Sequence, residues 1–238
     1  MYDKLKQIRD AFQMLSISLT DIQAEQFFSY YELLIEKNKL MNLTAITEFQ
    51  EVICKHFLDS LMICRLAEPK GRLLDVGTGA GFPGIPLKIV YPQLEVVLLD
   101  SLNKRVNFLG EVIEKLGLEN IMAIHGRAED LAKKKEYREQ FDFCVSRAVA
   151  NLSSLSEYCL PFVKMGGYFI PYKSCKIQEE LKMGEKAIFL LGGEMMKKED
   201  FELPDSDISR CLLQIKKVKN TPSNYPRKAG MPTKEPLF

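Results

Sequence analysis

A chain of 238 residues is long enough for one α/β domain with additional helices or for two small domains, and its 46% hydrophobic content supports an ordinary buried core. Its 33 basic and 32 acidic residues nearly balance, so the overall charge does not itself indicate a nucleic-acid partner. The sequence contains no apolar run of 18 residues that could cross a membrane, and the charged segment MYDKLKQIRD lacks the apolar core of a signal peptide. We therefore expect a soluble cytoplasmic protein that does not contact a membrane.

Helical patterns fill the first 70 residues, which we predict to form a helical N-terminal extension. Thr20 and Gln23 are spaced as a capping box at the start of a helix over residues 21–38. A similar apolar stripe predicts another helix from about residue 48 to 66. The apolar face of the 21–38 helix is predicted to contain Ile22, Phe27, Tyr31, Leu34 and Ile35.

From residue 71 onward, short apolar runs alternate with helical stretches, which predicts parallel βαβ units in one domain over residues 71–238. We predict strands over residues 73–76, 95–99, 121–124, 141–145, 168–172 and 212–218. The clearest helix between them covers residues 104–116. The basic tail at the end contains four prolines from residue 220 onward and is predicted not to be helical.

The six cysteines are scattered along the chain without a C-x-x-C pair. This spacing predicts neither a zinc site nor a disulfide framework. We therefore expect no metal and interpret the cysteines as small buried hydrophobic residues. They are Cys54, Cys64, Cys144, Cys159, Cys175 and Cys211.

Glycines gather directly after the first predicted strand, in LLDVGTGAGFPGIPLKIVY. Gly79, Gly81 and Gly84 match the spacing G-x-G-x-x-G, and Gly77 stands where the chain must reverse. Such a cluster indicates a tight turn or a backbone that lies close to a ligand. The spacing alone is a weak signal, but a strand before it and a helical pattern after it favour a cofactor-binding loop over a purely structural turn.

Polar residues also follow the other predicted strands, at the edge of an open sheet where ligands bind. Asp100 comes about twenty residues after the glycines, where a carboxylate can accept hydrogen bonds from ribose hydroxyls. Ala128 and Glu129 follow the third strand, where a backbone group and an acid could contact adenine. Arg147 follows the fourth strand, at the centre of the cleft. The alternatives are that Asp75 caps the glycine loop, that Asp100 caps the following helix, and that Glu129 is a solvated helix residue.

Two nucleoside cofactors compete for such a site. An NAD-dependent enzyme places a pyrophosphate on the loop, whereas a methyltransferase places there the methionine part of S-adenosylmethionine. Asp75, directly before the loop, would repel a pyrophosphate and attract the ammonium and sulfonium groups of S-adenosylmethionine. We therefore favour S-adenosylmethionine, with an NAD-dependent oxidoreductase or a non-catalytic RNA-binding protein on the same fold as alternatives.

The glycine segment LLDVGTGAGFPGIPLKI resembles the first motif of the RsmG family, also called glucose-inhibited division protein B. The segments KNKLMNLTAI, HFLDSL, LLDSLNKRVNFL, GRAED, SRAVANL and YPRKAGMPTKEPL are similar to that family in the same order, so the resemblance covers nearly the whole chain. It implies a Rossmann-like, seven-stranded methyltransferase domain over residues 71–238. The implied activity is S-adenosylmethionine-dependent methylation of nitrogen 7 of a guanine in small-subunit (16S) ribosomal RNA. Loss of this methyl group in the family is associated with low-level streptomycin resistance.

The resemblance also implies a set of cofactor-binding residues. To this set we add Gly79 from the loop and Asp100 from its place at a strand end. Arg147 is expected to bind the cofactor carboxylate or an RNA phosphate through its fork. No catalytic base is expected because nitrogen 7 carries no proton, and we interpret His56 as a partly buried, hydrogen-bonded residue. The positions that match the family are Gly77, Phe82, Ala128, Glu129 and Arg147.

The expected partner is small-subunit ribosomal RNA or the assembling 30S subunit, bound by a monomer. Asn38 and Asn42 could read base edges, although Asn42 could instead cap or turn the chain. Many family members have tryptophan where this chain has Lys37, which leaves a stacking role there without support. Lys173 is expected at a phosphate. The basic C-terminal strip, which contains Arg227, Lys228 and Lys234, is also expected to contact phosphates. We expect this strip to lie away from the glycine-loop cleft.

Overall fold

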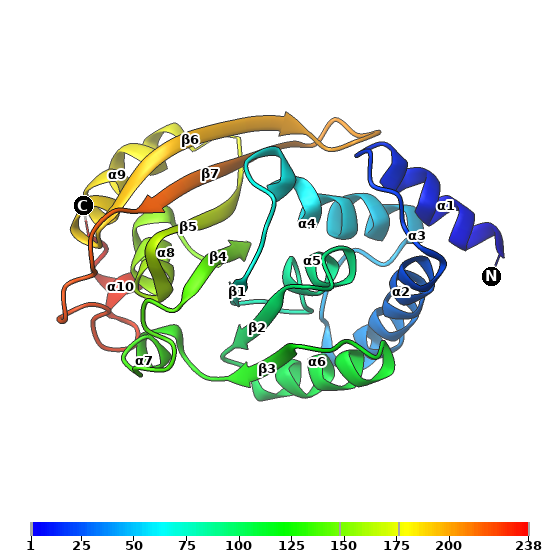
Figure 1. The fold of residues 1–238 in the computed structure, drawn as a ribbon, viewed down its shortest axis with the longest axis horizontal. Helices are drawn as coiled ribbons and strands as arrows, with labels where there is room; N and C mark the ends of the chain where they lie inside the picture. The colour runs from blue at the N-terminus through cyan, green and yellow to red at the C-terminus, as the bar shows by residue number, and fades with distance from the viewer. Residues whose placement is uncertain (1, 148, 176, 238) are drawn as a thin grey trace.

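Seven strands form one mixed sheet in the order β3-β2-β1-β4-β5-β7-β6 (Figure 1). The computed structural model describes residues 2–147, 149–175 and 177–237. The pairs among β1 to β5 are parallel, and β7 runs antiparallel to both β5 and β6. The predicted Rossmann-like, seven-stranded sheet is therefore confirmed. Its strands are β1 (Arg72–Val76), β2 (Glu95–Asp100), β3 (Ile121–His125), β4 (Phe141–Arg147), β5 (Val163–Ser174), β6 (Gly193–Glu202) and β7 (Ser209–Lys217).

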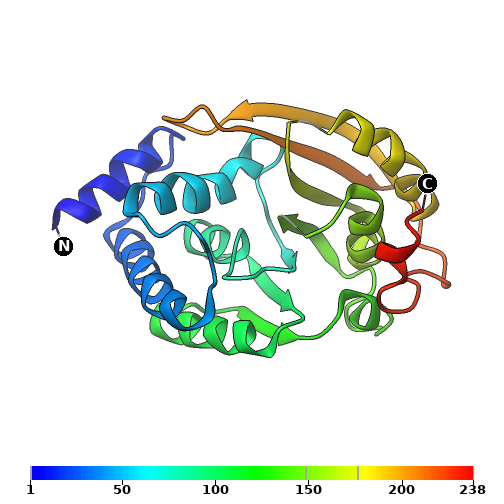
Figure 2. The ribbon, with the colours of Figure 1, turned by 180° about the vertical axis from the view of Figure 1, so that it is seen from behind.

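Helices cover both faces of the sheet, and the two views from opposite sides agree on this (Figures 1 and 2). The alternation of strand side chains explains the two layers, because Leu73 belongs to the hydrophobic core on one face and Leu74 to the core on the other. The described α-helices are α1 (Tyr2–Gln13), α2 (Asp21–Met41), α3 (Phe49–Val52), α4 (Asp59–Leu61), α5 (Gly84–Val90), α6 (Asn103–Lys115), α7 (Ala128–Leu131), α8 (Leu152–Cys159), α9 (Gln178–Leu190) and α10 (Met231–Lys234). Within the described ranges, none of them is long and apolar enough to cross a membrane.

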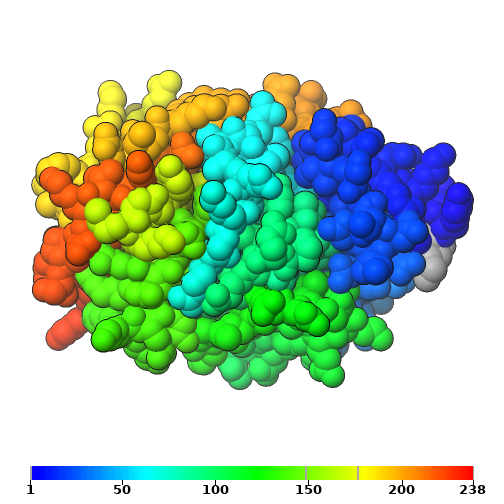
Figure 3. Space-filling view, viewed as in Figure 1, coloured from blue at the N-terminus to red at the C-terminus, as the bar shows by residue number. Residues whose placement is uncertain are grey.

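The N-terminal helices pack into the same core as one face of the sheet. The predicted capping box is confirmed, since Thr20 and Gln23 cap α2 reciprocally. The prediction that Ile22 lies on the buried face of α2 is wrong, since this residue is 69% exposed. It stands five residues before Phe27, which turns it about 140° away from the buried stripe of the helix. The space-filling view shows the N-terminal helices at one end of the molecule and the red C-terminal residues toward the other (Figure 3).

The helix predicted over residues 48–66 is broken into four short segments. A π-helix (Ile53–Leu58) separates α3 from α4, and a 3-10 helix (Met62–Arg65) ends the run. An apolar stripe cannot distinguish a regular helix from one that carries a π-turn, and such turns occur frequently at functional sites. Here the π-helix contains Lys55 and His56 and leads directly to Asp59.

Three other sequence expectations differ from the structure. Strand β6 was missed because it is an edge strand whose charged residues, among them Lys198 and Asp200, mask any apolar alternation. The tail contains the one-turn helix α10, which begins after Gly230 with a proline in its first turn. Cys64 is exposed, contrary to the expectation that the cysteines are buried.

Candidate functional site

Two neighbouring cavities open at the carboxyl ends of the parallel strands, with volumes of about 700 and 180 Å³. Gly77 lines both, so the glycine loop separates them. Every residue predicted to bind the cofactor lines one or the other: Gly77, Gly79, Phe82 and Arg147 the larger, and Gly77, Asp100, Ala128 and Glu129 the smaller. The structure therefore brings the predicted cofactor set together at one edge of the sheet.

The glycine loop is held close to the end of β2. The amides of Gly77 and Thr78 both donate to the carbonyl of Leu99, and the amide of Gly79 donates to Asp100 Oδ2 at 2.9 Å. Gly77 and Gly79 have φ of +71° and +63°, a region that favours glycine. A Cβ at Gly79 would meet no atom within 4 Å, so this residue faces the open cavity. The loop therefore leaves space for a ligand directly above its backbone.

Asp75 lies beneath the loop, fully buried, and not at the position expected for direct contact with an ammonium group. Its Oδ2 accepts hydrogen bonds from Thr78 Oγ1 at 2.7 Å and from the amide of Gly84 at 2.9 Å. It therefore fastens the loop to the start of α5. Its Oδ1 is buried without a hydrogen-bond partner among the described residues. Burial raises the pKa of Asp75 to about 6, although both hydrogen bonds and Arg147 act in the opposite direction.

This raised pKa predicts a pH-dependent contribution to stability. Because the folded pKa is about 6 and the usual value is 3.8, the contribution is fully present below pH 3.8 and is lost as pH rises through about 6. When the pH rises from 4.5 to 7, the free energy of unfolding of the unsubstituted chain should therefore fall by about 2 kcal/mol relative to that of Asp75→Asn, which has no carboxyl group at this position. Urea unfolding of both proteins at the two pH values measures this difference. A difference that does not change with pH would contradict the assignment.

Tyr30 supports the loop from the helical N-terminal segment. Its hydroxyl, fully buried, donates to the carbonyl of Ala80 at 2.5 Å. Its ring packs against Phe57 and Phe82, with centroids 5.6 and 5.4 Å apart. A Cβ at Gly81 would lie 2.7 Å from the Tyr30 hydroxyl, so the loop and this tyrosine fit closely. The segment before β1 therefore shapes the loop directly.

We expect Tyr30→Phe to weaken S-adenosylmethionine binding about fivefold, because it removes one buried hydrogen bond that holds the loop, worth about 1 kcal/mol. Tyr31→Phe is the matched control, since the Tyr31 hydroxyl makes an exposed bond to Thr47 at 3.3 Å. Isothermal titration calorimetry measures both affinities. Equal affinities for the two variants would contradict the supporting role of Tyr30.

The smaller cavity has two carboxylates in its wall. Asp100 is 3% exposed, and besides Gly79 it accepts from the amide of Leu102 at 2.9 Å. Arg105 Nη1 lies 3.4 Å from Asp100 Oδ2, so Oδ2 already has two donors, whereas Oδ1 keeps a lone pair that can accept another hydrogen bond. Glu129 lies in the one-turn helix α7 and accepts from the amide of Gly230 at 2.9 Å. Donors of a ribose and an adenine are the groups that these positions can bind.

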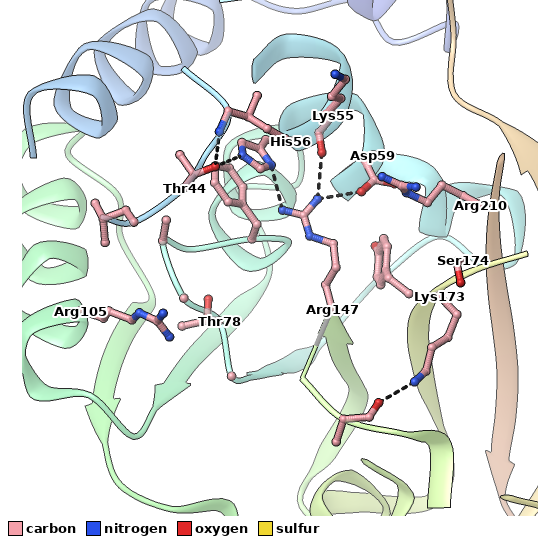
Figure 4. Close-up of a pocket in the computed structure, with 18 of the residues that line it drawn as sticks. Thr44, Lys55, His56, Asp59, Thr78, Arg105, Arg147, Lys173, Ser174 and Arg210 are labelled. Carbon is pink, nitrogen blue, oxygen red and sulfur yellow. Dashed lines mark hydrogen bonds and ion pairs between the residues drawn. The ribbon is translucent and has the colours of Figure 1, made fainter. Parts of the chain in front are cut away.

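Arg147 crosses from the end of β4 to the π-helix, as Figure 4 shows. Its guanidinium donates to Asp59 Oδ2 at 2.8 Å and to the carbonyl of Lys55 at 3.3 Å, and it lies over the Phe82 ring. Asp59 is 1% exposed, and Arg210 Nε lies 3.5 Å from its other oxygen. The guanidinium that we expect at a cofactor carboxylate or an RNA phosphate instead bonds a buried protein carboxylate through Nη1.

His56 is buried and hydrogen-bonded, as the sequence indicated. Arg147 can only donate, so the 3.3 Å contact makes Nδ1 of His56 the acceptor. The proton therefore lies on Nε2, which donates to Thr44 Oγ1 at 2.9 Å (Figure 4). Burial, followed by the charge of Arg147, lowers the pKa of His56 to about 3. The imidazole is therefore neutral at physiological pH and is a very weak base.

The other predicted substrate residues lie at different places. Asn38 Nδ2 donates to the carbonyl of Thr44 at 2.9 Å, and Asn38 Oδ1 accepts from the amide of Thr44 at 2.8 Å. Asn42 ends α2 in a left-handed conformation. These asparagines shape the loop that brings Thr44 to the larger cavity, and they are not among its described lining residues. Lys173 does line it, and its ammonium bonds Glu180 at 2.5 Å and the carbonyl of Ala150 at 2.6 Å.

None of the cations of the basic C-terminal strip is among the described lining residues of either cavity, but the tail contacts the wall of the smaller one. The amide of Gly230 bonds Glu129 in the smaller cavity, because the tail folds back over α7 and α8. The guanidinium of Arg227 forks onto Glu157 at 2.6 to 3.1 Å, which commits much of it to that buried carboxylate. Lys228 and Lys234 are exposed.

Several lining residues were not singled out from the sequence. Thr44 and Asp59 reach the larger cavity from the N-terminal segment, whose apolar stripes suggested only core packing. Their one signal was that they fall inside the segments KNKLMNLTAI and HFLDSL. Five cations and two carboxylates line the larger cavity, so its wall is basic. The cations are Lys55, Arg105, Arg147, Lys173 and Arg210.

Comparisons with known proteins agree with this arrangement. A family model described as rRNA small subunit methyltransferase G matches residues 23–209. The ribosomal RNA small subunit methyltransferase G of Lachnoclostridium phytofermentans is 60% identical over 94% of this chain and 93% of its own length. The protein of the same name from Desulforamulus reducens is 54% identical over 100% of both chains.

Solved structures support the fold. A SAM-dependent methyltransferase from Aquifex aeolicus matches with a TM-score of 0.52 and 20% identity, over 69% of this chain and 92% of that chain. TrmN from Thermus thermophilus matches with a TM-score of 0.52 and 18% identity, over 67% of this chain and 48% of that chain. From the family model and the near full-length relatives, the chain belongs to the rRNA small subunit methyltransferase G (GidB) family.

Proposed function

We propose that this chain transfers a methyl group from S-adenosylmethionine to nitrogen 7 of a guanine in small-subunit (16S) ribosomal RNA. The observation that carries the proposal is the open space above Gly79, inside a basic cavity of a chain that belongs to an rRNA methyltransferase family. Family membership also favours this activity over an NAD-dependent oxidoreductase and over a non-catalytic RNA-binding protein. The substrate is a component of the ribosome, so we expect the protein to act in the cytoplasm.

In this proposal the smaller cavity takes the adenosine half of the cofactor, with Asp100 at the ribose and Ala128 and Glu129 at the adenine. The methionine half lies along Gly77 and Gly79 beside Phe82. Both fits are supported by observed geometry: the lone pair left on Asp100 Oδ1, and a loop backbone that no neighbouring atom covers at Gly79. When bound, S-adenosylmethionine supplies an electrophilic methyl group on a sulfonium sulfur.

The rest of the larger cavity receives the guanine. Nitrogen 7 has a lone pair and carries no proton, so its methylation needs no general base. The site therefore has to place the base, and placement within reach of the methyl group can itself lower the barrier by several kcal/mol. The pKa of about 3 keeps His56 neutral, which avoids one more positive charge beside a base that becomes cationic. We assign to Arg147 the role of ordering the cavity wall at Phe82, because its guanidinium lies over the Phe82 ring.

For the RNA backbone we propose phosphate contacts at Lys173, next to the cavity, and at Lys228 and Lys234, on the exposed face of the tail. Asn38 and Asn42 act by shaping the loop that carries Thr44. One chain supplies both cavities, which supports action as a monomer with a helical segment over residues 1–70 and a methyltransferase domain over residues 71–238.

The deciding experiment compares two RNA substrates. The purified chain is incubated with radiolabelled S-adenosylmethionine and with 16S ribosomal RNA transcribed either with guanosine or with 7-deazaguanosine, and 30S subunits lacking the modification are tested in parallel. We expect label in 7-methylguanosine with ordinary RNA or subunits and no label with the 7-deaza transcript, which lacks nitrogen 7. Equal labelling of both transcripts, or no labelling of any substrate, would overturn the proposal.

A further inference from the structure

The last described residues of the chain, 221–237, run along α7 and α8, and we call them the strap (Figure 1). Arg138 holds the beginning of the strap, because its guanidinium donates to the carbonyls of Thr221 at 2.7 Å and Tyr225 at 2.9 Å. Two serines of α8 hold its end: Ser154 Oγ donates to the carbonyl of Pro232 at 2.6 Å and Ser153 Oγ to that of Leu237 at 2.8 Å. The strap is thus fastened along its length.

The middle of the strap is held by a buried ion pair. Glu157 of α8 is 0% exposed, and it accepts hydrogen bonds from the backbone amide of Arg227 at 2.8 Å and from its guanidinium. A two-pronged bond between arginine and a carboxylate fixes the orientation of both groups. This pair therefore sets where the following residues, including Gly230, lie.

The strap contacts two residues that line the smaller cavity. The amide of Gly230 donates to Glu129 Oε1 at 2.9 Å, and the hydroxyl of Thr233 lies 2.7 Å from that of Tyr158. Glu129 belongs to α7, which is four residues long and has no side-chain cap at Arg127. A helix of one turn is not stable by itself, so the position of Glu129 depends on contacts from outside α7.

We propose that the strap positions Glu129 for the adenine of S-adenosylmethionine, and that Arg227 is a positioning residue that acts through Gly230. The inference rests on the proposed function, which assigns the smaller cavity to adenosine. It gives Arg227 a role in cofactor binding in place of the RNA contact that the sequence suggested. The phosphate contacts proposed for Lys228 and Lys234 and the Gly230 contact that holds Glu129 then belong to one continuous segment.

The test is a double-mutant cycle on cofactor affinity. Arg227→Met is combined with Glu157→Gln, so that no unpaired carboxylate is left buried. This double substitution is introduced both into the unsubstituted chain and into the Glu129→Ala variant. Arg138→Met releases the strap at a second point without leaving any charge buried. Arg9→Met, which loses only an exposed pair with Asp21 at the opposite end of the molecule, is the control. Calorimetry with S-adenosylmethionine and with adenosine measures the affinities, and circular dichroism measures the melting temperatures.

We expect the Arg227→Met/Glu157→Gln pair and Arg138→Met each to weaken both ligands about tenfold, the effect of losing one hydrogen bond to a charged group. In Glu129→Ala the same substitutions should cost less than about twofold, because the group they position is absent. Arg9→Met should bind as the unsubstituted chain does. The inference would be overturned by equal losses of affinity in the unsubstituted and Glu129→Ala backgrounds, or by no loss of affinity in either strap variant. In both cases, binding of the ligands by the unsubstituted chain would still support the proposed function. An unsubstituted chain that binds neither ligand would instead overturn the proposed function and, with it, this inference.

Discussion

Gly79→Val is expected to lower the affinity for S-adenosylmethionine by at least about 100-fold while the fold persists. A valine side chain would extend into the space that is now open above Gly79, where the methionine half of the cofactor is proposed to lie. Overpacking of a tight contact typically costs about 1–3 kcal/mol, and a backbone shift that relieves the strain of a valine at φ +63° would add to it by weakening the bond from the residue 79 amide to Asp100. Isothermal titration calorimetry measures the affinity.

The substitution also strains the backbone, and the chain offers a matched control for this strain. Gly117, after α6, has φ of +59°, a Cβ there would meet no atom within 4 Å, and the residue lies outside the lining of both cavities as described. Gly117→Val should therefore lose about the same 1–2 kcal/mol of stability as Gly79→Val and bind the cofactor normally. Near-normal affinity in Gly79→Val, or an equal loss in Gly117→Val, would contradict the assignment of the loop.

The predicted cofactor residues came together because the information that places them is local. Each of Gly77, Asp100 and Arg147 follows an apolar run that forms a strand, and the carboxyl ends of parallel strands meet at one edge of the sheet. The alternation of strands and helices in the sequence was therefore enough to bring these residues to one cleft. The same reasoning placed Asp75 at the correct strand end. It could not tell whether the carboxylate faces the cavity above the loop or, as observed, the protein interior beneath the loop.

The partners of these residues could not be predicted, because they come from distant parts of the chain. Asp59 lies 88 residues before Arg147, and Gly230 lies 101 residues after Glu129. In the sequence, Asp59 lies in the segment predicted as a helix over residues 48–66 and Gly230 lies in a proline-containing tail, so neither has a local pattern that indicates a site. The π-helix that turns His56 toward Arg147 also has no sequence period of its own.

The buried pair of Arg147 and Asp59 leads to the second large effect. Arg147→Met should destabilise the protein by about 3–5 kcal/mol, because Asp59 then keeps a buried charge with only Arg210, at 3.5 Å, near it. Arg72→Met is the control: its guanidinium also lies over an aromatic ring, that of Phe141 at 4.9 Å, but its partner Glu95 is exposed, so we expect a loss of only about 0–1 kcal/mol. Urea unfolding measures both.

A second substitution separates the structural role of Arg147 from its role in the site. Asp59→Asn removes the unpaired charge, so the double variant Arg147→Met/Asp59→Asn should regain most of the lost stability. It should not regain methyl transfer, because no guanidinium then covers Phe82 or bonds Nδ1 of His56 in the wall of the larger cavity. Since the charge of Arg147 helps to lower the pKa of His56, that pKa should rise in the double variant, which an NMR titration of the imidazole measures. Recovery of stability and methyl transfer together would show that Arg147 only neutralises Asp59, and would remove it from the proposed site.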